Sequence, residues 1–377
     1  MGGFAIGTTE FAAMALVPYF SADLGVTEAR AADAISAYAL GVVVGAPVLA
    51  VLGAKLPRRS LLIVLMLAFG LFNTLSALAP DFRMMMLARF LSGLPHGAYF
   101  GVAALVAASV VERGQRSRAV ARVMLGLTVA TTLGGPFANV LGQTVGWRFG
   151  FGIVGLLAAA TALAVALKAP ADRPDPGANP LRELKALASR QVWLILITGA
   201  VGFGGFFAVY TYLASTLITT MQAPAIAVPA MLMLAGAGMT VFTLVAGWAA
   251  DRNPVAAGYA FLGLGTLVLL IYPAATVSLW TLAPVVFCLS VIGGLSTVLQ
   301  IRLMDVAGEA QQLAAALNHS AFNVANALGP FLAARAVAAG WRFPSSGYVG
   351  AALSLAGLGL YALMLADARR SAWRGSR

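Results

Sequence analysis

The sequence predicts an all-α membrane protein with twelve transmembrane helices, arranged as two parallel repeats of six helices. Three observations support this prediction. The 377 residues are 60% hydrophobic and only 10% charged, whereas a soluble domain is about 25% charged. Basic residues are concentrated in every second gap between the apolar runs. A set of motifs from the first half of the chain recurs 194 positions later.

The apolar runs are close in length to the roughly 20 residues that a helix needs to cross a bilayer. The gaps between them fall where charged residues, Pro and Gly collect. Dividing the chain at these gaps predicts helices at about 1–20, 32–52, 60–79, 82–110, 119–142, 148–168, 191–213, 227–248, 256–273, 279–303, 313–335 and 346–366.

The Lys and Arg residues are distributed unequally between alternate gaps. One set of gaps, which includes the long central loop and the C-terminal tail, holds eighteen of them. The other set holds five, namely Arg30, Arg83, Arg148, Arg335 and Arg342. Cytoplasmic loops carry an excess of Lys and Arg, so both termini and the central loop are predicted to be cytoplasmic.

The longest gap, residues 169–190, is rich in Pro and charge and divides the chain into near-equal halves. We therefore expect an N-terminal six-helix bundle at 1–168 and a cytoplasmic central loop at 169–190. A C-terminal six-helix bundle with a short cytoplasmic tail is expected at 191–377.

Two motifs recur in register in these halves. Gly135-Pro136-Phe137 and Gly146-Trp147-Arg148-Phe149 return as Gly329-Pro330-Phe331 and Gly340-Trp341-Arg342-Phe343. The two copies lie six helices apart, an even number, and so end on the same side of the membrane; the halves are therefore predicted to be parallel repeats related by an axis along the membrane normal. That symmetry predicts a substrate cavity between the halves, near the midplane.

The charge distribution and the motif content of the sequence argue against several classes of function. The net charge of +11 lies in the short gaps and not on one face of a soluble domain, which argues against a nucleic-acid partner. Cys288 is the single cysteine, so neither an intrachain disulfide nor a cysteine zinc site is expected. There is no phosphate-binding loop and no metalloprotease or hydrolase motif. We expect no cofactor, no metal and no enzymatic activity.

Three stretches resemble the major facilitator superfamily and, within it, bacterial drug/proton antiporters of the arabinose-efflux and chloramphenicol-resistance type. They are Gly7-Thr8-Thr9-Glu10-Phe11, Tyr38-Ala39-Leu40-Gly41 continuing to Gly45-Ala46-Pro47, and Arg89 followed by Ser92-Gly93-Leu94-Pro95-His96-Gly97-Ala98. The resemblance covers nearly the whole chain. It implies a two-bundle fold and alternating access.

The same resemblance implies gating loops and an antiporter motif in the fifth helix. The loop between helices 2 and 3 departs from the family pattern, because Ala54 stands where an Asp is usual. The copy between helices 8 and 9 keeps its Asp-Arg pair. The residues that carry these expected roles are Lys55, Arg58, Arg59, Gly135, Pro136, Asp251 and Arg252.

Charges inside the predicted helices mark the candidate proton-coupling residues, since each costs about 2.5–3.5 kcal/mol to insert into a membrane. Glu10 is interpreted either as a proton-binding carboxylate or as a structural carboxylate paired within its own half. Arg89, His96 and Phe100 lie on one face of the fourth helix. Arg89 would tune a carboxylate or hold an anion, or else lock the packing. His96 would titrate or form a hydrogen-bonded helix contact.

Polar and aromatic side chains at helical spacing are the candidates for the substrate cavity. Such stripes either line a wet cavity or hold helices together, and for the aromatic stripe Phe203, Phe207 and Tyr210 core packing is the favoured interpretation. The expected cavity residues are Tyr38, Phe100, Thr128, Thr132, Asn139, Tyr210, His319, Asn323 and Asn326.

Together these patterns predict a monomeric secondary transporter in a bacterial inner membrane. It would export a small organic solute, drug-like or sugar-like, in exchange for protons. A proton- or solute-coupled importer is the alternative within transporters. A channel or a membrane sensor is the alternative from another class, although residues 169–190 are too short for a sensor's output domain.

Overall fold

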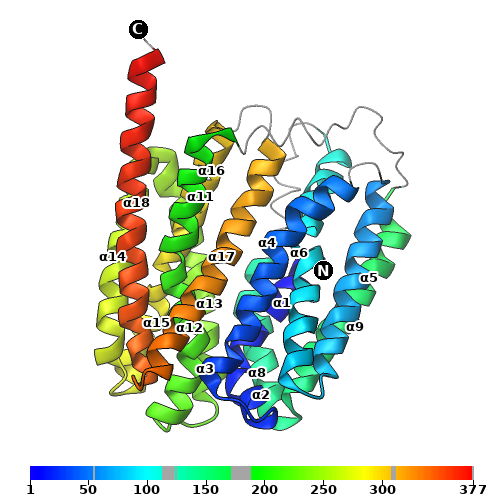
Figure 1. Ribbon diagram of the computed structural model, residues 1–377, viewed down its shortest axis with the longest axis vertical. Helices are drawn as coiled ribbons and strands as arrows, with labels where there is room; N and C mark the ends of the chain where they lie inside the picture. The colour runs from blue at the N-terminus through cyan, green and yellow to red at the C-terminus, as the bar shows by residue number, and fades with distance from the viewer. Residues whose placement is uncertain (54–55, 113–122, 124, 171–187, 307–310, 376–377) are drawn as a thin grey trace. The chain divides into compact units, whose positions relative to one another are not determined.

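The computed structural model describes residues 1–53, 56–112, 123, 125–170, 188–306 and 311–375, and in that part of the chain every regular element is a helix (Figure 1). Its residues group into two compact units. The first contains Met1–Pro180 with Thr211–Gly236, and the second contains Leu181–Tyr210 with Ala237–Arg377. Residues 211–236, from the predicted second half, therefore pack in the first unit. The two units are defined by packing, whereas the predicted halves are defined by the sequence repeat. The units therefore do not test the halves, which stay a prediction.

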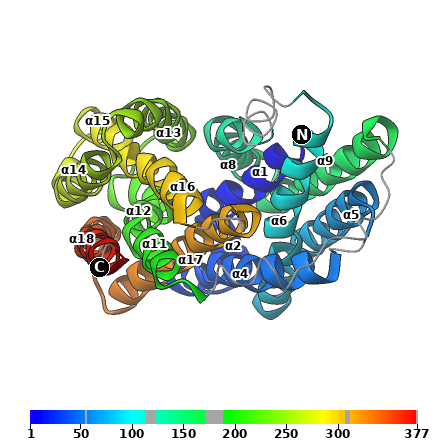
Figure 2. The ribbon, with the colours of Figure 1, turned by 90° about the horizontal axis from the view of Figure 1, so that it is seen from above.

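The first unit is built from helices that pair closely. Helix α4 lies beside α6, and α5 lies beside α9 (Figures 1 and 2). The elements that lie wholly in this unit are α1 (Gly2–Ala15), α2 (Val17–Asp23), α3 (Glu28–Ala31), α4 (Asp33–Gly53), α5 (Arg58–Ala77), α6 (Phe82–Ser109), η2 (Ala130–Gly134), α8 (Gly135–Thr144), α9 (Trp147–Lys168) and η4 (Thr216–Thr220).

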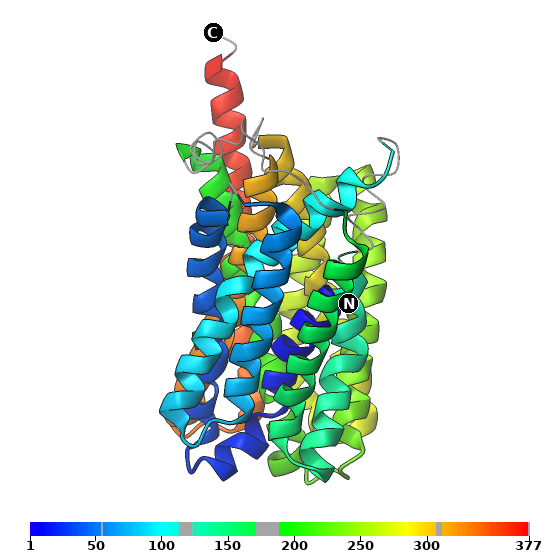
Figure 3. The ribbon, with the colours of Figure 1, turned by 90° about the vertical axis from the view of Figure 1, so that its right-hand side faces the viewer.

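The second unit packs α11 against α17 and α18, and α14 against α18. Helix α18 continues well past the ends of its neighbours α11 and α14 (Figures 1 and 3). The elements are α11 (Arg190–Gly202), α12 (Gly204–Ser215), α13 (Ala227–Arg252), α14 (Pro254–Ala275), α15 (Leu279–Leu289), η5 (Ser290–Gly293), α16 (Gly294–Val306), α17 (Gln311–Ala338), η6 (Phe343–Ser345) and α18 (Ser346–Gly375); α12 and α13 extend into the first unit.

Some predicted helices are interrupted. The predicted helix 1–20 divides at Leu16 into α1 and α2; Pro18 lies in the first turn of α2, where no intrahelical donor is needed. The predicted helix 191–213 divides at Phe203, which lies between two glycines. Within 279–303, a short 3₁₀ turn joins α15 to α16. Such breaks cannot be predicted from a continuous apolar run, because apolar composition indicates an apolar environment and not the backbone conformation.

Eight helices of the described chain are long and apolar enough to cross a membrane. The predicted ranges 1–20, 82–110, 119–142 and 313–335 are not among them. Helix α1 has only 14 residues, and part of 119–142 lies outside the described residues. The ranges 82–110 and 313–335 carry several of the polar residues predicted for the site, and polar side chains lower hydropathy. The all-α fold is confirmed, while the count of twelve spans stays a prediction.

The first unit is tightly packed because α4 and α6 cross at glycines. A Cβ added to Gly93 would lie 2.1 Å from the carbonyl oxygen of Tyr38, and one added to Gly41 would lie 2.1 Å from that of Phe90. No side chain fits at either position. This close approach of two backbones is typical of membrane helices with small residues at their interface, and it brings Tyr38 against the face of α6 that carries Arg89 and His96.

Candidate functional site

The centre of the candidate site is Arg89, whose side chain is 1% exposed. Its Nη1 donates hydrogen bonds to the hydroxyl of Thr9 at 3.0 Å and to the amide oxygen of Asn73 at 3.4 Å. The guanidinium carbon lies 4.3 Å from the centre of the Tyr38 ring and 5.2 Å from that of Phe151. Helices α1, α4, α5, α6 and α9 each contribute one of these groups. Neutral acceptors and aromatic faces therefore hold a cation inside the first unit.

Tyr38 connects Arg89 to His96. Its hydroxyl lies 2.8 Å from Nδ1 of His96 in a hydrogen bond, while the face of its ring meets the guanidinium of Arg89. The His96 ring also packs against Phe100, with ring centres 5.4 Å apart. Arg89 and His96, from the predicted face of the fourth helix, thus both contact Tyr38 of α4. The hydrogen bond allows Tyr38 and His96 to share a proton, in either tautomer of the imidazole.

Glu10 lies next to this cluster on α1. Its side chain is 7% exposed, and it is close enough to Tyr38 and Arg89 for its charge to interact with both. The structure thus brings five predicted residues together in the first unit: Glu10, Tyr38, Arg89, His96 and Phe100. A carboxyl, a phenol, an imidazole and a guanidinium gathered in one apolar bundle are the kinds of group that bind and move protons.

Three residues on the predicted fifth helix, Thr128, Thr132 and Asn139, take part in helix hydrogen bonds. Asn139 is fully buried and donates to the carbonyl oxygen of Ala15 at 2.9 Å, so its amide holds α8 against α1. The Thr132 hydroxyl donates to the Thr128 carbonyl of its own helix at 3.2 Å. Both Thr128 and Thr132 are partly buried. Their predicted role in a cavity stays a prediction.

The predicted residues of the second unit form two groups. Tyr210 is buried and stacks on Phe206 with ring centres 5.3 Å apart. Asn323 and Asn326 are buried on α17, and Asn323 donates to the His319 carbonyl at 3.0 Å. The Oδ1 atom of Asn323 is a buried acceptor without a partner among the described residues. Such an acceptor is costly unless water or a ligand reaches it.

The residues expected to gate the transporter are described only in part. Lys55 lies outside the described residues, as does the side chain of Asp251. Arg59 donates to the carbonyl of Ala166, in the last turn of α9, where a cation suits the helix dipole. Arg252 folds back over the Trp248 ring at 3.9 Å. Both arginines therefore stabilise helix ends in this structure, and their gating role stays a prediction.

The repeated motif is used differently in its two copies. Gly146 and Gly340 both have positive φ angles, +119° and +91°, so both copies make the turn that favours glycine. Trp147 is 4% exposed and donates to Asp23 at 3.0 Å. Arg148 forms an ion pair with the same carboxylate. In the second copy Trp341 is 57% exposed.

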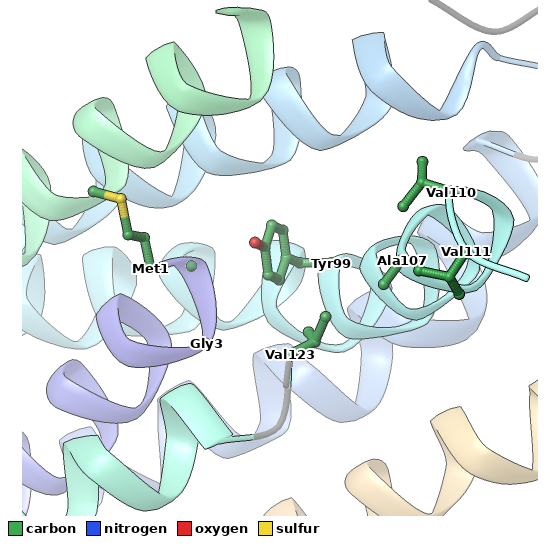
Figure 4. Close-up of a pocket in the computed structure, with 8 residues that line it drawn as sticks. Met1, Gly3, Tyr99, Ala107, Val110, Val111 and Val123 are labelled. Carbon is green, nitrogen blue, oxygen red and sulfur yellow. The ribbon is translucent and has the colours of Figure 1, made fainter. Parts of the chain in front are cut away.

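A separate cavity of about 350 Å³ lies near the start of α1. Figure 4 shows the Tyr99 ring projecting between Met1 and the Val110–Val111 end of α6. The Tyr99 ring also packs edge-on against Phe100, with ring centres 5.9 Å apart. None of the predicted site residues lines the cavity, whose lining is Met1, Gly2, Gly3, Tyr99, Ala107, Val110, Val111 and Val123.

Three partners of Arg89 were not predicted from the sequence, namely Thr9, Asn73 and Phe151. Thr9 was noted only within a motif, and Phe151 looks like any apolar residue of its helix. Asn73 could have been singled out from the sequence. The bilayer core offers no hydrogen-bond partners, so an Asn inside an apolar run must find one within the protein. It donates to the Phe69 carbonyl at 2.8 Å and accepts from Thr9.

Comparison with known proteins decides the family. The profile of the Major Facilitator Superfamily matches residues 1–311. The chain belongs to the major facilitator superfamily. It is therefore an integral membrane transporter, and the predicted resemblance is confirmed.

Relatives and a solved structure agree with this assignment. The chain is 37% identical to the inner membrane transport protein YdhP of Escherichia coli K12, covering 94% of this chain and 92% of that protein. It is 35% identical to the chloramphenicol resistance protein of Streptomyces lividans, over 88% and 86% of the two chains. The crystal structure of a mutant of the nucleoside transporter NupG is similar in fold, with a TM-score of 0.77 at 12% identity over 96% of this chain and 97% of that chain.

Proposed function

We propose that this transporter exports a small organic solute across a bacterial inner membrane, in exchange for protons. The observation that carries the proposal is the buried ionisable cluster of Glu10, Tyr38, Arg89 and His96 in the first unit. Intramembrane charges are costly and persist where they serve transport. The name of the Streptomyces relative, a chloramphenicol resistance protein, supports the export of a drug-like molecule.

In the proposed mechanism, Glu10 binds and releases the coupled proton. Arg89 is fixed by Thr9 and Asn73, so its charge acts on the Glu10 carboxyl from a constant position. Tyr38 and His96 share a hydrogen bond through which a proton can move toward α6. A proton or a substrate can shift the transporter between its two states only if it binds one of them more tightly.

The substrate is proposed to contact side chains from both sequence halves. Thr128 and Thr132 offer hydroxyls in the first half. His319, Asn323 and Asn326 offer polar groups in the second half, where Asn323 has an acceptor without a partner among the described residues. Hydrogen-bonding groups without a fixed opposite charge suit an uncharged polar or drug-like solute. Both termini are proposed to be cytoplasmic, and the protein to work as a monomer.

The proposal is tested with purified protein in proteoliposomes. A thermal-stabilisation screen over sugars, nucleosides and antibiotics first selects a ligand. Radiolabelled ligand is then offered to vesicles with an imposed pH gradient, acidic inside. We expect accumulation against the ligand's gradient, and its loss when an ionophore removes the pH gradient.

The alternatives give different results in the same vesicles. An importer that cotransports protons accumulates ligand only when the gradient is reversed. A channel equilibrates the ligand without accumulating it under either gradient. Accumulation that does not respond to the pH gradient would contradict proton coupling.

A further inference from the structure

Residues 211–236 pack against the rest of the first unit at three places. The hydroxyl of Ser215 donates to the Glu28 carboxylate. The amide of Gln143 donates to the Ala225 carbonyl at 3.0 Å. The backbone of Gly236 lies so close to η2 that an added Cβ would be 2.6 Å from Cα of Thr132. Two polar contacts and one backbone contact thus dock this segment, which we call the docked segment.

Both sides of this contact contain π-helical turns. The turn η4 begins directly after Ser215, and the turn η2 includes the Thr132 that faces Gly236. A π turn inserts an extra residue into a helix and frequently occurs at functional sites. The docked segment therefore has one π turn beside its contact with Glu28 and faces another at Gly236.

Glu28 is the acidic group of this contact. It is partly buried at the first position of α3, and Ser215 is fully buried. Tyr212, also buried on the docked segment, lies close enough to interact with the charges of Glu28 and Asp33. When the segment is docked, the Glu28 carboxyl is therefore removed from part of its water.

Among the described residues, the other charged groups in this region form no ion pair with Glu28. Arg30, on the same helix, lies 5.7 Å from the centre of the Phe82 ring. Asp23, at the end of α2, forms its ion pair with Arg148, and Asp33, at the start of α4, adds a second negative charge. Tyr212 is neutral as a phenol. The partner that the structure records for the Glu28 carboxylate is the Ser215 hydroxyl.

We propose that Glu28 is a second proton-binding group of the transport cycle, and that its protonation stabilises the docked segment. Removing an ionised carboxylate from water costs more than one hydrogen bond returns. Protonation removes that cost, so the docked arrangement is favoured at low pH. Deprotonation favours release of the segment, because the free carboxylate is then fully hydrated. This inference rests on the proposed proton antiport and adds a proton-dependent gate to it.

The test measures the distance between spin labels on the two sides of the contact. Labels are placed at Ala22→Cys and Ile226→Cys, both exposed positions, in a Cys288→Ser background. Double electron–electron resonance in lipid nanodiscs from pH 5 to 9 gives the docked and released fractions. We expect the docked-to-released ratio to fall at least tenfold over this range. Glu28→Gln should stay docked and lose most of this pH response, leaving only the part that Glu10 contributes.

Further variants separate the possible outcomes. Ser215→Ala should keep the pH dependence and lower the docked fraction at every pH. Glu112→Gln, an exposed carboxyl outside the contact, is the matched control and should behave like the parent protein. A Glu28→Gln variant that keeps the parental pH response overturns the inference, as does a parent protein without one. Transport without proton coupling would instead contradict the proposed antiport, and it is measured separately in the proteoliposomes.

Discussion

Arg89 shows how a single charge can be held inside an apolar bundle. It is fixed by two neutral acceptors and two aromatic faces. An arginine suits this site because its planar guanidinium can donate hydrogen bonds and stack at the same time. Each acceptor is important, because a buried polar group that loses its partner costs about 1–3 kcal/mol.

Asn73→Leu tests this account of Arg89. The change keeps the side-chain size but removes the amide oxygen that accepts from Arg89 and from Thr9. We expect the free energy of unfolding to fall by about 1–3 kcal/mol, measured by thermal unfolding in detergent. Thr74→Val is the neighbouring control, since the Thr74 hydroxyl only donates back to its own helix at Gly70. Equal losses in both variants would contradict the role of Asn73.

Glu10→Gln tests the coupling role. Glutamine cannot release a proton, so gradient-driven accumulation in proteoliposomes should be lost while ligand binding stays measurable. The pH dependence of ligand binding should also become much smaller. His96→Gln is the comparison, and it should weaken transport without removing coupling. If Glu10→Gln vesicles still accumulate ligand when acidic inside, Glu10 is not the coupling residue and His96 becomes the candidate.

Among individual residues, the charged groups that the structure gathers were easier to predict from the sequence than their partners were. Glu10, Arg89 and His96 stand out because charge is rare in lipid, and the structure gathers them. Phe151 could not be predicted as a partner of Arg89, since an aromatic residue in a membrane helix is ordinary. Asn139 was predicted either to line a cavity or to hold helices together; its amide donates to the Ala15 carbonyl, and its cavity role stays a prediction, because polarity alone does not distinguish the two.

Among the elements, the pair α4–α6 depends on glycine. Gly93→Ala should push the two backbones apart, because its Cβ would lie 2.1 Å from a carbonyl oxygen. Overpacking of this kind costs about 1–3 kcal/mol, measured by thermal unfolding, and it should also disturb the Tyr38–His96 hydrogen bond. Gly101→Ala on the same helix is the control. No atom lies within 4 Å of its added Cβ, so it should be neutral or slightly stabilising.

Asp23 of α2 bonds to Trp147 and Arg148 of α9, and the stability that this contact contributes should depend on pH. Hydrogen bonds from Arg148, and then from Trp147, lower the pKa of the Asp23 carboxyl. A lowered pKa means that the contact stabilises the fold above the ordinary value near 3.8, and that this stability is lost as the pH falls through the lowered pKa. The pair is about half exposed, so its contribution is at most about 1 kcal/mol.

Arg148→Gln should therefore lower the unfolding temperature slightly at pH 7, and the difference from the parent should shrink below about pH 3.8. Arg342→Gln is the matched control from the second copy of the motif, where the described residues include no acidic partner for Arg342. A control that loses as much stability as Arg148→Gln would show that the motif, and not the ion pair, carries the effect. Thermal unfolding from pH 3 to 8 gives both comparisons.

Helix positions were largely predictable, whereas helix interruptions were not. The predicted ranges coincide with helices wherever the structure describes them, apart from short breaks such as Leu16 and Phe203. Pro18 and the glycines around Phe203 were visible in the sequence. Whether they interrupt the helix could not be predicted, because a membrane helix tolerates Pro and Gly when neighbours satisfy the freed backbone groups.

For the whole molecule, the internal repeat predicted the architecture that the superfamily assignment supports. The two copies share the positive-φ glycine but not its surroundings. The residue that lies 194 positions after Asp23 is Leu217, so the second copy has no equivalent acid to hold its Trp and Arg. Sequence symmetry therefore predicts the common backbone turn, while the contacts that differ between copies depend on residues outside the motif.

Orientation in the membrane is the remaining property that the sequence predicts for the whole molecule. Eighteen basic residues against five predict that both termini and the central loop lie in the cytoplasm. In a Cys288→Ser background, Ile226→Cys should react with an impermeant maleimide added to intact cells, because Ile226 is 73% exposed in a loop predicted to be periplasmic. Ala178→Cys, in the central loop, should react only after the cells are made permeable. Labelling of Ala178→Cys from outside, with Ile226→Cys protected, would reverse the predicted orientation and with it the direction assigned to export.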